Sequence, residues 1–120
     1  MESIQILKPG VPVSAIGDVI EKIARRQGCS VVHQFVGHGV GLQFHENPQV
    51  PHCKNTVSIP LVPGMTFTIE PMINLGVAEG ELDQKDKWTV RTLDRKASAQ
   101  WEHTILITEE GHEILTPWAK

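Results

Sequence analysis

The sequence has 120 residues, which suffices for one domain with a single hydrophobic core. Hydrophobic residues make up 40% of it and charged residues 21%, proportions that are typical of a folded soluble chain and exclude a disordered one. The formal net charge of −3 provides no basic surface for a phosphate backbone, so we expect no nucleic-acid partner.

The sequence carries no recognisable targeting or membrane-spanning segment. Residues 1–9 lack a basic region followed by an apolar stretch, and no apolar run approaches the roughly 18 residues that span a bilayer. We therefore expect a cytoplasmic protein without membrane contact. Cys29 and Cys53 form no Cys-x-x-Cys pair, which predicts two reduced thiols.

A helix is predicted over residues 14–26. Ser14 can cap its start, Arg25 and Arg26 complement the dipole of its last turn, and Gly28 follows its end. Apolar residues form one stripe at a spacing of about 3.6 residues: Ile16, Val19, Ile20, Ile23 and Ala24. Such a stripe needs a sheet to cover.

Four later segments have the composition and alternation of strands: residues 30–36, 65–73, 88–92 and 101–108. The polar residues 93–100 separate the last two, and residues 76–87 are expected to form a polar, mobile connection. The predicted fold class is α/β (α+β), with one main helix packed on a mostly antiparallel sheet.

Two of these strands contain a carboxylate among apolar residues. Alternation places Glu70 on one face with Thr66 and Thr68, and it places Glu102 on one face with Thr104. A carboxylate in such a strand is costly unless a cation compensates its charge. For either glutamate alone, a solvated strand face explains the pattern equally well.

Histidines provide the nitrogen donors. Gly37, Gly39 and Gly41 surround His38 and suit a turn that presents one imidazole, although a merely flexible turn fits the same residues. His45 is a second imidazole nearby. For the remaining ones we expect hydrogen-bonded structural or surface roles: His33, His52, His103 and His112. His38, Glu70 and Glu102 together predict a site for a divalent metal.

The sequence contains four distinctive motifs: Gly-His-Gly-Val-Gly at residues 37–41, Phe-His-Glu-Asn-Pro at 44–48, Pro-Gly-Met-Thr-Phe-Thr-Ile-Glu-Pro-Met at 63–72, and Ser-Ala-Gln-Trp-Glu-His-Thr at 98–104. Together they resemble the C-terminal half of the type I methionine aminopeptidases, which are pita-bread enzymes of peptidase family M24. The resemblance covers about residues 7–115. Aminopeptidase P, prolidase and creatinase chains share the first two motifs but differ around the last carboxylate. Type II enzymes carry an insertion for which the 32 positions from His38 to Glu70 leave no room.

The resemblance implies a pita-bread fold whose two halves enclose a dinuclear centre, which removes the initiator methionine from nascent polypeptides. His38, Glu70 and Glu102 match three of the family's five metal ligands, with Glu102 as the bridging carboxylate. Glu70 is also a candidate to receive the proton of the attacking water. His45 matches the imidazole that hydrogen-bonds the scissile amide, and Phe44 and Trp88 match residues that line the pocket for the methionine side chain.

Two aspartate ligands and a further catalytic histidine of the family precede the region matched here. Residues 1–120 are thus interpreted as a single partial domain, the C-terminal lobe, which holds at most one of the two ions (Co, Mn, Fe or Zn) and has little activity alone. Its expected partners are a peptide N-terminus, a complementing N-terminal half or a second copy of itself. The alternative is a catalytically inactive, stand-alone α/β domain that binds a partner or a single divalent ion.

Overall fold

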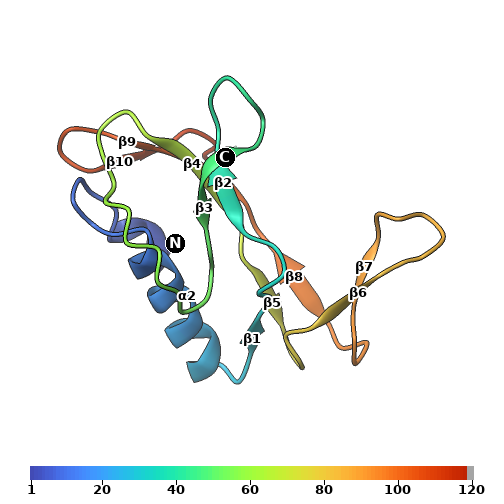
Figure 1. Cartoon of the computed structure of the whole chain (residues 1–120). Helices are drawn as coiled ribbons and strands as arrows, with labels where there is room; N and C mark the ends of the chain where they lie inside the picture. The colour runs from blue at the N-terminus through green and yellow to red at the C-terminus, as the bar shows by residue number, and fades with distance from the viewer. Residues whose placement is uncertain (119–120) are drawn as a thin grey trace.

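The computed structural model describes residues 1–118. One long helix, α2 (Ser14–Arg26), lies along one side of two small antiparallel sheets, and a hairpin projects on the other side (Figure 1). A short helix, α1 (Glu2–Gln5), precedes α2. The predicted fold class, one main helix on a mostly antiparallel sheet, is therefore confirmed.

The larger sheet has five strands, all paired antiparallel. In spatial order they are β10 (His112–Ile114), β9 (His103–Ile107), β4 (Thr66–Ile69), β2 (Gly37–Gly39) and β3 (Glu46–Val50). A three-stranded sheet consists of β1 (Ser30–Val31), β5 (Met72–Asn74) and β8 (Ser98–Gln100), and the projecting hairpin consists of β6 (Gly80–Leu82) and β7 (Val90–Thr92).

The core lies between α2 and the five-stranded sheet. Ile16, Ile20 and Ala24 of the predicted helix stripe are buried against strand residues that include Phe67 and Ile105, both fully enclosed. Burying one such side chain stabilises the fold by about 1.5–3 kcal/mol. Val19 and Ile23 are only half-buried, because they line a shallow groove beside α1. The apolar stripe thus fixes which face of α2 meets the sheet.

The start of α2 differs from the prediction. Ser14 is the first helical residue, Val13 is the N-cap, and no side chain caps the helix. The Ser14 N–H instead donates to the carbonyl of Val57 at 3.0 Å, so a neighbouring segment satisfies the free helix amide. At the other end, Gly28 adopts a positive φ of 67°, as a glycine after a helix typically does.

The predicted strands are shorter in the structure because the chain changes sheets within them. Of residues 30–36, only Ser30–Val31 pair as β1, and the following residues cross to the larger sheet. Residues 65–73 divide into β4 and β5. Of residues 101–108, His103–Ile107 form β9, whereas β8 lies in the stretch predicted to be a polar separator.

The prediction of a mobile connection over residues 76–87 is wrong. These residues contain β6, which pairs with β7 through Glu81 opposite Arg91. Arg91 forms an ion pair with Asp83 at 2.7 Å, and the Gln34 side chain holds the hairpin base through the N–H and carbonyl of Gly80. Local hydrogen bonds and a strand ladder therefore order a segment that has little apolar content.

Two further expectations concern the cysteines and the membrane. Cys29 and Cys53 are both free thiols, as predicted. Among the helices of residues 1–118, none is long and apolar enough to cross a bilayer.

Candidate metal centre

The two glutamates of the predicted site lie where a pair of strands changes sheets together. β4 pairs with β9 up to Ile69 opposite His103, and β5 pairs with β8 from Met72 opposite Gln100. Between these pairs, residues 70–71 of one strand face residues 101–102 of the other. The prediction that Glu70 and Glu102 lie within regular strands is therefore wrong. Both lie in opposing breaks between the two sheets.

Pro71 and two side-chain hydrogen bonds to the Glu70 backbone explain this break. Pro71 has no N–H for a strand ladder, and regular pairing ends two residues before it, at Ile69. The Glu70 N–H then donates to Nε2 of His52 at 3.1 Å, and the Glu70 carbonyl accepts from Gln100 Nε2 at 3.1 Å. Two side chains thus satisfy the backbone groups that the sheet no longer pairs.

His38 lies on strand β2 rather than in the predicted turn. A Cβ on Gly37 would lie 2.2 Å from the carbonyl oxygen of Thr68, and one on Gly39 would lie 2.1 Å from that of Asn47. Neither glycine has a positive φ, so their role is close approach to the flanking strands β4 and β3. This approach brings His38 beside the strand that leads into Glu70.

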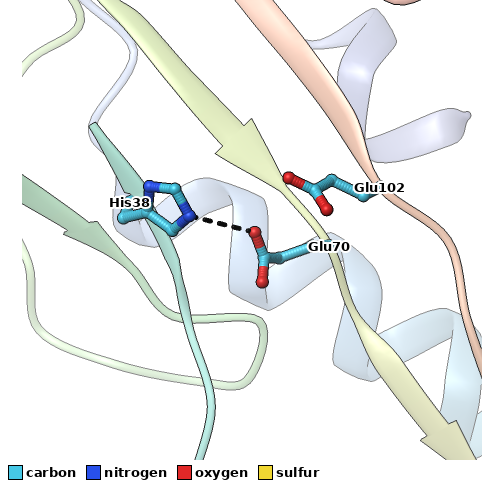
Figure 2. Close-up of side chains that lie close together, drawn as sticks. All are labelled: His38, Glu70 and Glu102. Atoms are coloured by element: carbon cyan, nitrogen blue, oxygen red, sulfur yellow. Dashed lines mark ion pairs between the residues drawn. The ribbon is translucent and has the colours of Figure 1, made fainter. Parts of the chain in front are cut away.

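The structure brings His38, Glu70 and Glu102 together. Each offers one ligand atom, and these atoms all lie within 4.8 Å of one another. Figure 2 shows the three side chains converging from β2, from the end of β4 and from the segment before β9. Nε2 of His38 lies 3.4 Å from Oε2 of Glu70, and both side chains are mostly buried. No other such group of three potential ligands occurs within residues 1–118.

The hydrogen bonds of His38 direct a lone pair into this group. Nδ1 lies 3.0 Å from the carbonyl oxygen of Gly39, which can only accept, so Nδ1 carries the proton. In the neutral ring, Nε2 then has a free lone pair that faces the carboxylate of Glu70. Two acceptors in this position repel unless a proton or a metal ion lies between them, and a backbone carbonyl behind the ring is the usual support of a metal-binding histidine.

The pKa of Glu102 also reflects the close approach of these groups. Glu102 is exposed as a whole, but partial desolvation of its carboxyl raises the pKa, the nearby charge of Glu70 raises that pKa further, and His38 opposes both effects. A cation between the two carboxylates would reverse this balance, because it favours the ionised form of both groups. One imidazole nitrogen and two carboxylate oxygens are a donor set that fits divalent Mn, Fe, Co or Zn.

His45 and Phe44 lie beside the group. They belong to the loop between β2 and β3, whose Gln43 N–H donates to the carboxylate of Glu46 at 3.2 Å. The ring centres of His38 and His45 are 4.2 Å apart, and those of His38 and Phe44 are 5.9 Å apart. Both side chains are largely exposed, which leaves them accessible to a substrate.

Trp88 is not brought to the group. It lies in the loop between β6 and β7 with 86% of its surface exposed, and Figure 1 shows this hairpin directed away from β2. Within residues 1–118, no observed contact supports the predicted position of Trp88 in a substrate pocket.

The family follows from a comparison with known sequences. The model of metallopeptidase family M24 matches residues 1–109. The chain belongs to this family.

Among M24 relatives, the chain is 64% identical over 115 residues to a methionine aminopeptidase of Chlamydia pneumoniae, covering 96% of the chain but 40% of that protein. It is 50% identical over 115 residues to the methionine aminopeptidase of Escherichia coli strain K12, of which it covers 43%. The chain thus spans about two-fifths of the length of the curated relatives it matches.

Solved M24 structures agree with this similarity. The chain matches a methionine aminopeptidase from Rickettsia prowazekii with a TM-score of 0.91 and 42% identity, over 95% of this chain and 46% of that one. A prolidase from Pyrococcus furiosus matches with a TM-score of 0.68 and 25% identity, over 98% of this chain and 29% of that one. The fold therefore corresponds to a part of the pita-bread fold, and the methionine aminopeptidase resembles it more closely than the prolidase does.

The M24 resemblance predicts two aspartate ligands that the described residues do not supply. Asp83, Asp86 and Asp94 belong to the hairpin and its flanks, where each accepts backbone hydrogen bonds, and Asp18 is exposed on α2. These bonds lower the pKa values of all three hairpin aspartates; that of Asp86 falls to about 2, with the Thr89 hydroxyl as the largest cause.

Two residues that hydrogen-bond to Glu70 were not selected as site residues from the sequence. Thr68 donates its hydroxyl to Oε2 of Glu70 at 2.7 Å, and its position on the predicted face of Glu70 was the available signal. His52 was expected to be a hydrogen-bonded structural histidine, and it is one, but no pattern indicated that its partner is Glu70. His103 and His112 are likewise hydrogen-bonded to backbone carbonyls, whereas His33 is exposed.

Proposed function

We propose that this chain forms the C-terminal part of the active site of a methionine aminopeptidase, which removes the N-terminal methionine from nascent polypeptides. The observation that carries the proposal is the group of His38, Glu70 and Glu102, whose ligand atoms lie within 4.8 Å in a chain of family M24. The 64% identity to a methionine aminopeptidase supports this substrate over that of a prolidase.

The three residues are proposed to hold one divalent ion, with Glu102 able to share a second. No aspartate belongs to the group within residues 1–118, so the described residues offer a second ion a single carboxylate. A stable site for divalent metals normally needs at least three protein ligands. One ion for each 120-residue chain is therefore the expected stoichiometry.

A bound divalent ion supplies Lewis acidity, which lowers the pKa of water and polarises a substrate carbonyl. Glu70 is proposed to receive the proton of the attacking water, because its carboxylate lies inside the group and is held there by Thr68. His45 is proposed to hydrogen-bond the scissile amide, since its exposed ring lies beside His38.

The methionine side chain is proposed to contact Phe44, a residue that is 74% exposed and whose ring lies next to that of His45 at 4.5 Å between ring centres. Trp88, which is 86% exposed in the β6–β7 loop, remains a predicted member of this pocket. A cytoplasmic location follows from the proposed substrate, because nascent chains emerge there.

The experiment measures methionine release from a Met-Ala peptide in the presence of Mn²⁺ or Co²⁺. The 120-residue chain alone is expected to release little methionine. A fusion that places the unmatched N-terminal part of the Chlamydia pneumoniae relative before this chain is expected to release it at least 100-fold faster. In that fusion, Glu70→Gln should remove most of the gain, since the proton acceptor is lost.

A second candidate is a catalytically inactive domain that binds one metal ion or a partner. Three converging ligands within residues 1–118 are enough to hold a single ion, which supports this candidate. The same fusion distinguishes the two, because an inactive domain would bind metal and yet give no methionine release in a correctly folded fusion.

A further inference from the structure

The hydroxyl of Thr68 joins two of the proposed ligands. Thr68 lies on β4, opposite Thr104 of β9, and its side chain is 1% exposed. Its Oγ1 accepts the backbone N–H of His38 at 3.0 Å and donates to Oε2 of Glu70 at 2.7 Å. A single buried oxygen atom thus contacts the backbone of one ligand and the carboxylate of the other.

The directions of these two hydrogen bonds are fixed. A backbone N–H can only donate, so the oxygen of Thr68 must accept from His38. The one hydroxyl proton is then available for Glu70, whose ionised carboxylate can only accept. The oxygen–oxygen distance of 2.7 Å is that of a well-formed hydroxyl hydrogen bond.

The same contact replaces part of the ladder between β2 and β4. These two strands pair through Gly39 opposite Phe67, and the neighbouring N–H of His38 donates to the side chain of Thr68 instead of a backbone carbonyl. The close approach at Gly37 makes this bond possible, because a Cβ there would lie 2.2 Å from the Thr68 carbonyl oxygen. The position of His38 relative to Glu70 therefore depends on the Thr68 hydroxyl.

We propose that Thr68 is a positioning residue, which orders His38 and Glu70 for metal binding before the ion arrives. It does not contact the ion itself. The inference rests on the proposed metal site and adds what determines its affinity. Groups that hydrogen-bond metal ligands in this way typically contribute 10- to 100-fold to metal affinity.

The test compares three single variants of the 120-residue chain by calorimetric titration with Co²⁺ and by the visible absorption spectrum of the bound ion. Thr68→Val keeps the shape and removes the hydroxyl, whereas Thr68→Ser keeps the hydroxyl. Thr66→Val is the matched control on the same strand, since the hydroxyl of Thr66 contacts none of the three ligands.

Thr68→Val is expected to bind Co²⁺ at least 10-fold more weakly and to alter the spectrum, because Glu70 is no longer fixed. Thr68→Ser and Thr66→Val should bind Co²⁺ with an affinity within about 3-fold of the wild type and should show the wild-type absorption spectrum. Wild-type affinity and spectrum in Thr68→Val would overturn the inference and leave the metal site standing. A wild-type chain that binds no Co²⁺ would overturn both the metal site and the role of Thr68.

A further measurement needs no substitution, in case Thr68→Val does not fold. NMR of the wild-type chain should detect a slowly exchanging hydroxyl proton on Thr68, whose resonance shifts when Zn²⁺ is added. A hydroxyl proton that exchanges at the rate of exposed threonines would contradict the proposal.

Discussion

Glu70 and Glu102 face each other at the point where two paired strands leave one sheet and enter another. The register of the paired strands places Glu70 directly opposite Glu102, so both side chains project from the same face. At the break, both project into the space beside His38. The cross-strand pairing of the two glutamates and the close approach of β2 to β4 thus bring the three residues of the candidate metal centre together.

Metal affinity should rise with pH more steeply than it would at a site whose carboxyl groups have ordinary pKa values. The pKa of Glu102 is raised, mainly by burial and then by Glu70, so its proton must leave when an ion binds. Titration with Mn²⁺ should therefore give a tighter dissociation constant at pH 7 than at pH 5. Glu102→Gln should flatten this dependence; an equally steep dependence in that variant would refute the assignment.

The metal-free chain should become slightly more stable when one of the two carboxylates is neutralised. A raised folded-state pKa means that Glu102 favours folding below its unfolded pKa, and that this contribution is lost as the pH rises through the folded value. Glu102→Gln should thus raise the free energy of unfolding at pH 7 by about 0.5 kcal/mol. Urea denaturation measures this, and a less stable metal-free variant would indicate that the carboxylate has a favourable structural contact.

A buried neutral histidine should make the fold sensitive to acid. Burial lowers the pKa of His52 to about 4, and its Nε2 accepts the Glu70 N–H, which requires the neutral ring. Because the folded-state pKa lies below the unfolded value of 6.5, the contribution of His52 is complete above pH 6.5 and declines as the pH falls towards 4. The loss should reach about 3 kcal/mol at pH 4.

Urea denaturation of the wild type and of His52→Gln, at pH 7 and at pH 5, measures this dependence. The glutamine can still accept the Glu70 N–H but does not titrate. A decline between the two pH values that is as large in His52→Gln as in the wild type would assign the effect to other groups.

The helix and the ligand residues were predictable from sequence for different reasons. The stripe of Ile16, Ile20 and Ala24 identifies the buried face of α2, because helical periodicity depends on local spacing alone. His38, Glu70 and Glu102 were identified by their motifs, not by periodicity. The structure shows the predicted convergence of these three side chains. Their roles in binding a metal remain predictions.

The change of sheets was not predictable from alternation, because both sheets require the same period of two residues. Pro71 was the local signal for the end of β4, since it cannot donate to a ladder. Strand β2 consists of two glycines around His38, which have low strand propensity, and it forms because β3 and β4 lie on either side. The bond from Glu70 to His52 joins residues 18 positions apart, and no pattern within either segment indicates it.

The 120-residue chain should self-associate. Its three tryptophans are all exposed, at 86% for Trp88, 50% for Trp101 and 68% for Trp118, and Leu42 and Phe44 are exposed in the loop after β2. Trp101 and Trp118 stack with ring centres 4.2 Å apart, and a contiguous exposed apolar patch of this kind often marks a contact with another chain. Sedimentation velocity at increasing concentration should show dimers or larger species, and a monomer that binds no hydrophobic dye would contradict this.

Metal binding tests the central claim most directly, and one calorimetric titration of the 120-residue chain with Mn²⁺ or Co²⁺ measures it. Binding of one ion for each chain is predicted, and saturation at about 100 times the dissociation constant should raise the melting temperature by on the order of 10 °C. His38→Ala should lose most of both effects. An absence of binding by a folded wild-type chain, or equal binding by His38→Ala, would contradict the assignment of His38, Glu70 and Glu102 as a metal centre.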